Sequence, residues 1–135
     1  EAEFVLKVYD LRREAVLRES RAIITGKFSP KSYEEFIAIT KPDHEYNAAF
    51  RQVSSYWEMI YSFAKSGAID PDFLVSSGNG EGLYIYARFA PFIEQLRVDH
   101  SPLAFANCEW LVKNSEFASL RYNMMLKRLH PTMNQ

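Results

Sequence analysis

The residues that most resemble a phosphate-binding site are the glycine-rich segment 78–82, Gly-Asn-Gly-Glu-Gly, which comes directly before a helical pattern. The free backbone amides at the start of a helix can bind an anion. However, no strand precedes the segment, and Leu83 stands where a dinucleotide motif needs its third glycine. Glu81 would also repel phosphate, so these glycines predict a flexible connection and no cofactor site.

The histidines and carboxylates give no catalytic or metal-ligating pattern. His44, His100 and His130 lie far apart in the sequence, and none has a partner at the spacing of i and i+4 that chelates zinc on a helix. Acidic residues such as Asp43 and Asp70 stand where helices begin and are typical of N-caps. No Gly-x-Ser-x-Gly elbow is present. We therefore assign no catalytic residue and no metal ligand, and an enzyme would need a carboxylate to meet one of the histidines in the fold.

The single cysteine, Cys108, lies among apolar neighbours, and its type and position predict a core residue without a chemical role. It has no partner for an internal disulfide, so nothing requires an oxidising compartment.

The formal net charge of -1 supplies no field that would gather nucleic acid. No stretch reaches the ~18 apolar residues of a membrane span. These features predict a cytoplasmic domain that does not bind nucleic acid.

Aromatic side chains are the more informative group, because 15% of the residues are Phe, Trp or Tyr and many fall on helical stripes. Most clustered aromatics form a core, but Tyr and Trp are also favoured in pockets and interfaces. We select five residues as the candidate pocket or interface: Trp57, Glu58, Tyr61, Tyr84 and Arg88.

The elements that position these residues are amphipathic helices. Apolar side chains recur at steps of three and four over residues 4–25 and 46–64, and Gly26 and Gly67 supply stops. Ser32 and Glu35 have the spacing of a capping box. A central helix from 81 is expected to kink at Pro91, and amphipathic stretches follow over 103–112 and 117–129. The fold class predicted is all-α, a compact bundle of about six or seven helices in a single domain, residues 1–135.

The run from Tyr56 to Leu74 resembles an uncharacterised bacterial family of all-helical domains, a domain of unknown function. Its members have an aromatic-Glu-aliphatic helix, here Tyr56 to Ile60, followed by Gly-x-Ile-Asp and a short helix. Residues 89–93 and the basic Arg97 are similar to a later element of the family. The resemblance covers about residues 4–129 and brings no known activity. Because members often carry one N-terminal transmembrane helix, it implies a membrane contact only through an anchor outside the given residues.

The continuous amphipathic helices and the near-neutral charge favour a non-enzymatic protein-interaction or scaffold module. So does the absence of residues at the spacing of a catalytic motif. Its partner would be another protein or a second copy of the chain. The alternative is small-molecule binding in an aromatic pocket between helices.

Overall fold

The computed structural model describes residues 1–12 and 14–133, and these residues form nine α-helices, one π-helical turn and no strand. The all-α prediction is confirmed, with more and shorter helices than expected. The chain divides into two compact units, Glu1–Tyr56 and Trp57–Gln135. The prediction of a single domain stays a prediction. Among the described residues, no helix is long and apolar enough to cross a membrane.

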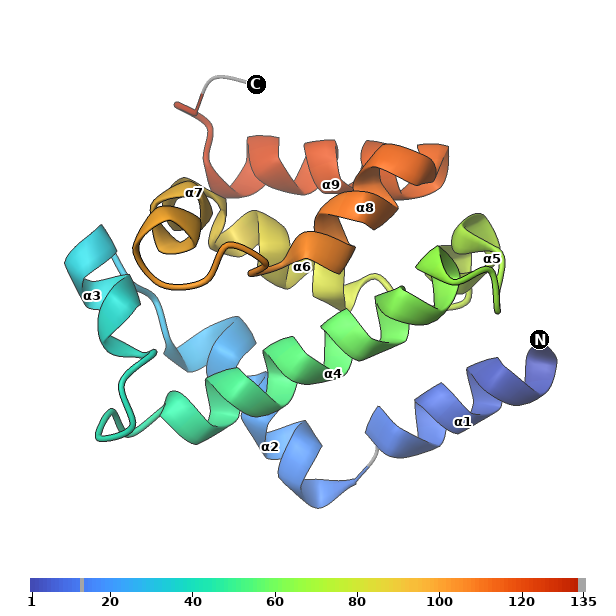
Figure 1. Cartoon of the computed structure of the whole chain (residues 1–135), viewed down its shortest axis with the longest axis horizontal. Coiled ribbons are helices and arrows are strands. Elements are labelled where there is room, and N and C mark those ends of the chain that lie inside the picture. Colours follow the sequence, from blue (N-terminus) through green and yellow to red (C-terminus); the bar gives the residue numbers. More distant parts are fainter. Residues whose placement is uncertain (13, 134–135) are drawn as a thin grey trace. The chain divides into compact units, whose positions relative to one another are not determined.

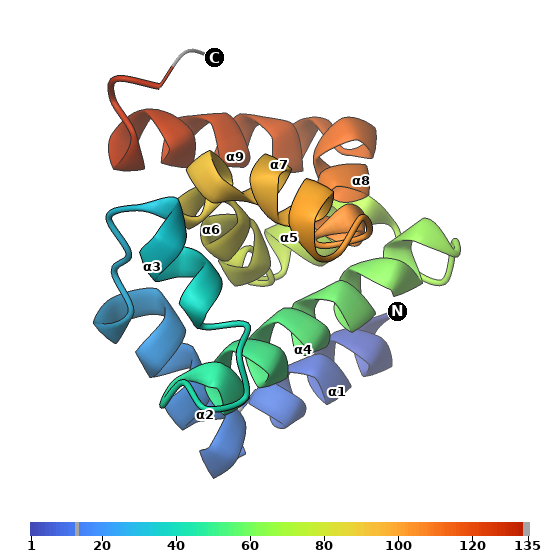
Figure 2. The same cartoon turned by 60° about the vertical axis from the view of Figure 1, so that its left-hand side comes forward.

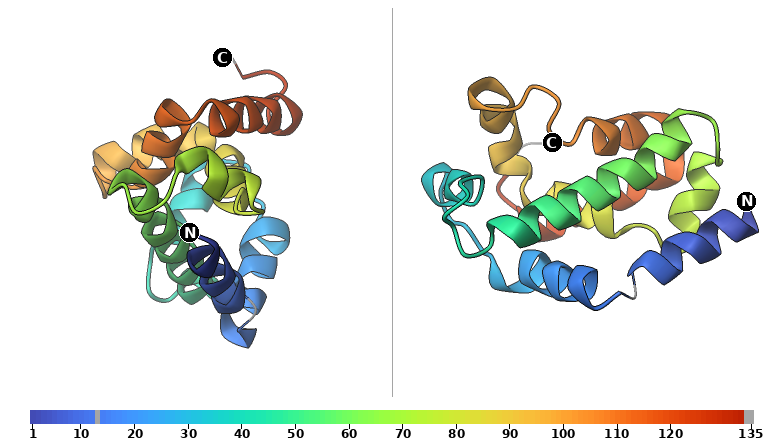
Figure 3. Two further views of the ribbon diagram at one scale, coloured as in Figure 1. Left: turned by 90° about the vertical axis from the view of Figure 1, so that its right-hand side faces the viewer. Right: turned by 60° about the horizontal axis from the view of Figure 1, so that its bottom comes forward.

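The first unit contains α1 (Ala2–Arg12), α2 (Ala15–Ala22), the π-helical turn (Ile23–Lys27), α3 (Tyr33–Ala38) and the beginning of α4. α1 and α2 are two helices that meet at an angle, where one long helix was expected (Figure 3). Glu14 is the N-cap of α2 and has extended backbone angles, φ -62° and ψ 139°. Because these angles are not helical, α2 begins as a new helix after Glu14. The Ser32 half of the predicted capping box is confirmed, because Ser32 Oγ accepts a hydrogen bond from the Glu35 amide at 3.2 Å. The Glu35 carboxylate accepts from the Lys31 amide at 3.2 Å.

α4 (Asn47–Lys65) is the longest helix, and its first ten residues belong to the first unit and its remaining nine to the second. Its buried stripe includes Val53, Trp57 and Ile60, spaced by four and three residues as predicted. Each such side chain contributes roughly 1.5–3 kcal/mol by leaving water. Within the first unit, the Tyr56 hydroxyl donates to the Val8 carbonyl at 2.9 Å. The helix ends before Gly67, whose φ of 89° suits glycine.

The second unit continues with α5 (Pro71–Ser76), α6 (Glu81–Arg88), α7 (Ala90–Asp99), α8 (Ala106–Asn114) and α9 (Glu116–Leu129). α9 packs against α5, α6 and α8, and it lies alongside α6 and α8 in both views (Figures 1 and 2). Ser115 begins α9 by accepting a hydrogen bond from the Ala118 amide at 3.0 Å, while its own hydroxyl donates to Asp72.

The central helix expected to kink at Pro91 is two helices, α6 and α7, separated at Phe89. Phe89 has φ -99° and ψ 7°, outside the helical range, and Pro91 lies in the first turn of α7, where a missing amide costs little. In a continuous helix, the carbonyl of Ala87 would need the amide that Pro91 lacks. His130 Nε2 lies 2.8 Å from that carbonyl and donates to it. The break therefore leaves no unsatisfied carbonyl at Ala87.

Candidate functional site

Trp57 and Tyr61 lie one turn apart on α4 and are both buried. Their rings are 5.5 Å apart between centroids. The Tyr61 hydroxyl donates to the Asn79 carbonyl at 2.7 Å, and Trp57 Nε1 donates to Glu81 Oε1 at 3.4 Å. The Tyr61 hydroxyl thus holds the connection before α6, and the Trp57 indole holds Glu81, the first residue of that helix. Burial raises the pKa of the Tyr61 hydroxyl well above its usual value, which keeps it a protonated donor.

Glu58 holds the start of α8 through two backbone amides. Its Oε1 accepts from the Asn107 amide at 3.0 Å and its Oε2 from the Cys108 amide at 2.9 Å. The Asn107 side-chain amide donates in return to the Glu58 carbonyl at 3.0 Å. A carboxylate at a helix N-terminus is favoured by the free amides and by the helix dipole. This geometry makes Glu58 a cap supplied from another helix.

Cys108 has the environment of a core residue. Burial, followed by the adjacent Glu58 carboxylate, raises the pKa of its thiol well above the ordinary value. Its sulfur lies 3.9 Å from the Gly82 carbonyl, so the thiol is a weak donor to it. A thiol held protonated in this way is a poor nucleophile.

Tyr84 and Arg88 lie one turn apart on α6, and both are half-buried. The Arg88 guanidinium carbon is 6.0 Å from the centroid of the Phe89 ring, within the range of a cation–π contact. The role of the five selected residues in a pocket or interface stays a prediction, although Trp57, Glu58 and Tyr61 are already engaged within the second unit.

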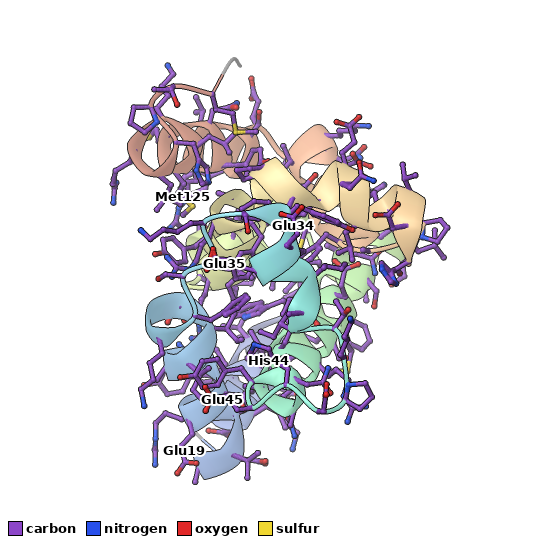
Figure 4. The ribbon with its side chains drawn as sticks, turned by 90° about the vertical axis from the view of Figure 1, so that its left-hand side faces the viewer. Glu19, Glu34, Glu35, His44, Glu45 and Met125 are labelled. Carbon is purple, nitrogen blue, oxygen red and sulfur yellow. The ribbon has the colours of Figure 1, made fainter. Side chains whose placement is uncertain are left out.

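The first unit has a pocket of about 310 Å³, lined by Phe28, Ser29, Pro30, Glu35, Ala38 and His44. Glu35 and His44 come from α3 and from the connection to α4 (Figure 4). Glu35 Oε2 accepts from the Lys31 amide at 3.2 Å, and His44 Nδ1 accepts from the Tyr46 amide at 3.0 Å. Both groups therefore have local structural bonds. Within residues 1–12 and 14–133, no group of three or more His, Cys, Asp or Glu side chains is placed to hold a metal ion.

α9 presents an apolar stripe to solvent, opposite the face that packs on its neighbours. Phe117, Leu120 and Met124 are 43%, 66% and 62% exposed. Their spacing of three and four residues places them on one side of the helix. Ala118 and Leu126 are buried on the other side. We call the three exposed residues the α9 stripe. The sequence pattern predicts an amphipathic helix here, but it does not indicate which of the apolar residues face solvent.

The geometry defines an all-helical domain whose ionisable side chains, where their partners are described, act mainly as caps and packing contacts. A family model described as domain of unknown function (DUF4760) matches residues 1–115, and the chain belongs to this family. The resemblance to a helical domain of unknown function is thereby confirmed. No curated protein and no solved structure matches the chain.

Proposed function

We propose that the chain is a non-enzymatic protein-interaction module whose contact surface is the α9 stripe. The exposure of Phe117, Leu120 and Met124 on one side of a single helix supports this proposal. Single exposed apolar residues are ordinary on protein surfaces, whereas a row that follows the helical repeat matches the anchors by which amphipathic helices bind. The same proposal includes a cytoplasmic location and membrane attachment only through an anchor outside the given residues, as the family resemblance implies.

The partner that best fits the stripe is a second copy of the chain, with the two α9 helices antiparallel. A two-fold axis near Leu120 places Leu120 against its own copy and Phe117 against Met124. In such a pair, the side chains that flank the stripe on one side of a helix lie next to the side chains that flank it on the same side in the second copy. Burying these apolar side chains supplies the attraction.

The charges at the two ends of α9 agree with this register. Glu116 in the first turn and Lys127 in the last turn are both exposed. They are eleven residues apart, which is about three helical turns, so they lie on the same edge of the stripe. In the antiparallel pair, Glu116 of each copy meets Lys127 of the other. A parallel pair would instead place like charges together at each end.

Sedimentation velocity over a concentration series tests the proposal. One helix pair buries less than a standard interface, so we expect a dimer with a Kd on the order of 100 µM. Leu120→Glu places a charge at the two-fold axis and should make the chain monomeric. Val98→Glu is the matched control, because Val98 is 77% exposed and lies on α7. That variant should dimerise like the unchanged chain.

A charge exchange tests the antiparallel register. Glu116→Lys and Lys127→Glu should each weaken the dimer about two- to tenfold, and the double variant should recover it, because exposed pairs contribute roughly 0.2–1 kcal/mol each. A chain that stays monomeric at about 1 mM, well above the expected Kd, would overturn self-association. A dimer unaffected by Leu120→Glu would overturn the α9 surface.

A further inference from the structure

The connection between α5 and α6 contains Asn79, the only asparagine in the sequence that a glycine follows. The two residues can react with each other. The Gly80 backbone nitrogen attacks the side-chain carbonyl carbon of Asn79, so that a C–N bond forms, the bond to the side-chain nitrogen breaks and ammonia leaves. Water then opens the resulting succinimide ring and leaves aspartate or isoaspartate at position 79. Glycine permits this attack most readily, because it has no Cβ atom beside the attacking nitrogen.

The folded chain opposes the reaction at Asn79, which is only 1% exposed. Its side-chain amide donates to the Leu74 carbonyl at 3.2 Å, and its backbone carbonyl accepts from the Tyr61 hydroxyl at 2.7 Å. Ring closure must rotate the side chain and the peptide group of Asn79 toward each other. Both hydrogen bonds therefore resist it.

Gly80 is also buried, beneath an arginine of α9. A Cβ atom built on Gly80 would lie 3.0 Å from Arg121 Cζ and 3.1 Å from each terminal nitrogen of that side chain. These similar distances place the flat face of the guanidinium against the glycine. Because the second step of the reaction consumes water, this cover protects the site as well.

The product of the reaction does not fit the folded site. A carboxylate oxygen would replace the Asn79 side-chain nitrogen and face the Leu74 carbonyl, which is also an acceptor. The other side-chain oxygen, Asn79 Oδ1, is already buried without a hydrogen-bond partner among the described residues. A buried carboxylate without donors is strongly unfavourable. Isoaspartate would in addition lengthen the main chain directly before α6.

We propose that Asn79 and Gly80 form a latent deamidation site. It reacts only when the second unit unfolds, and its product then prevents that unit from folding again. The rate of the reaction follows the population of the unfolded form, and each event makes unfolding irreversible. The site does not involve the α9 stripe, so it does not depend on self-association.

Incubation of the full chain at mildly alkaline pH, in buffer and in unfolding guanidinium chloride, tests the proposal. Trypsin separates Asn79, in peptide 66–88, from the exposed Asn114, in peptide 114–121, and mass spectrometry measures the loss of the amide in each. In the unfolded chain, Asn79 should react faster than Asn114, which a serine follows. In the folded chain, Asn79 should react at least about a hundredfold more slowly than in the unfolded chain. Equal rates in the two states would overturn the protection by the fold.

Two variants distinguish unfolding of the second unit from a local opening of the connection. Glu58→Gln weakens the contact that holds the start of α8, far from Asn79 in sequence, and should speed the loss of Asn79 in buffer about five- to thirtyfold. Glu34→Gln, exposed on α3 in the first unit, is the control and should leave the rate unchanged. A rate that Glu58→Gln does not alter would show that the connection opens locally, against the proposal.

A refolding experiment tests the irreversible step. After incubation in guanidinium chloride and dilution, the fraction of chains that fails to regain its helix signal should equal the fraction deamidated at Asn79. Asn79→Asp should be less stable than the unchanged chain, whereas Asn114→Asp, at an exposed position, should fold normally. An Asn79→Asp chain as stable as the unchanged one, or full refolding of deamidated chains, would contradict this step.

Discussion

Gly82 is the residue at which the packing of the second unit is least tolerant of a change. A Cβ atom built there would lie 2.6 Å from Tyr61 Cε2 and from its hydroxyl oxygen. Tyr61 cannot easily move, because it is buried and its hydroxyl donates to the Asn79 carbonyl. We expect Gly82→Ala to lower the free energy of unfolding by about 1–3 kcal/mol, as measured by urea denaturation followed by circular dichroism.

The matched control is Gly26→Ala in the π-helical turn, where a Cβ atom would meet nothing within 4 Å. Alanine favours helix over glycine by about 0.5–1 kcal/mol, so this variant should be neutral or stabilising. Equal destabilisation by the two substitutions would contradict the assignment of the effect to Tyr61.

At the scale of single residues, the sequence predicts local interactions well and distant ones poorly. The Ser32 cap is recognisable because its partner is three residues away. Glu58 was selected only as one of five candidate pocket or interface residues. Its actual partners, the amides of Asn107 and Cys108, are 49 and 50 residues away. Nothing in the local pattern around Glu58 can indicate them.

The start of α8 depends on α4, which gives a prediction for a whole element. Glu58→Gln retains the size of the side chain but removes the charge that both amides of α8 bind. We expect a loss of about 1–2 kcal/mol in the free energy of unfolding, typical of a lost N-terminal cap. Glu34→Gln, exposed on α3, is the control and should change the free energy by less than about 0.5 kcal/mol. A Glu58→Gln variant as stable as the unchanged chain would contradict the capping role.

Helix periodicity predicts α4 and the stretch that contains α9, because their apolar stripes are long and end at clear signals. It does not predict the division between α6 and α7, since the apolar pattern continues through Phe89 while the backbone does not. The sequence also does not predict the pocket of about 220 Å³ around Arg97, because its lining comes from α6, α7, α8, α9 and the chain that follows α9. The spacing of Ala90, Ile93 and Arg97 marks only the α7 side.

For the whole molecule, two buried tyrosines and the half-buried Tyr122 predict instability at alkaline pH. The pKa of Tyr61, Tyr86 and Tyr122 is raised in the folded chain, in each case mainly by burial, from an ordinary value of 10.0. Between the unfolded and folded pKa values, the folded chain binds more protons, so its stability falls as pH rises above 10. For the fully buried Tyr61 the loss approaches about 1.4 kcal/mol per pH unit. Tyr86, Tyr122 and the Cys108 thiol act in the same direction.

A titration that records tyrosinate absorbance and circular dichroism together measures this effect. Exposed tyrosines should ionise first, with helix content unchanged. The buried ones should ionise only as the helices unfold, so the second absorbance rise should coincide with the loss of helix signal. If all tyrosines ionised in one reversible step near pH 10.0 with the helices intact, the burial of these hydroxyls in solution would be contradicted.

The continuity of α4 across both units has a consequence for the route by which the chain folds. The Tyr56–Val8 bond in the first unit and the Glu58–Cys108 bond in the second span 48 and 50 residues, and they start two residues apart on the same helix. Closing a long loop loses chain entropy before the contact is gained, and such closures slow folding. Two loops of similar length therefore close onto the middle of α4 from opposite directions along the chain. The middle of α4 is therefore the point on which both loop closures depend.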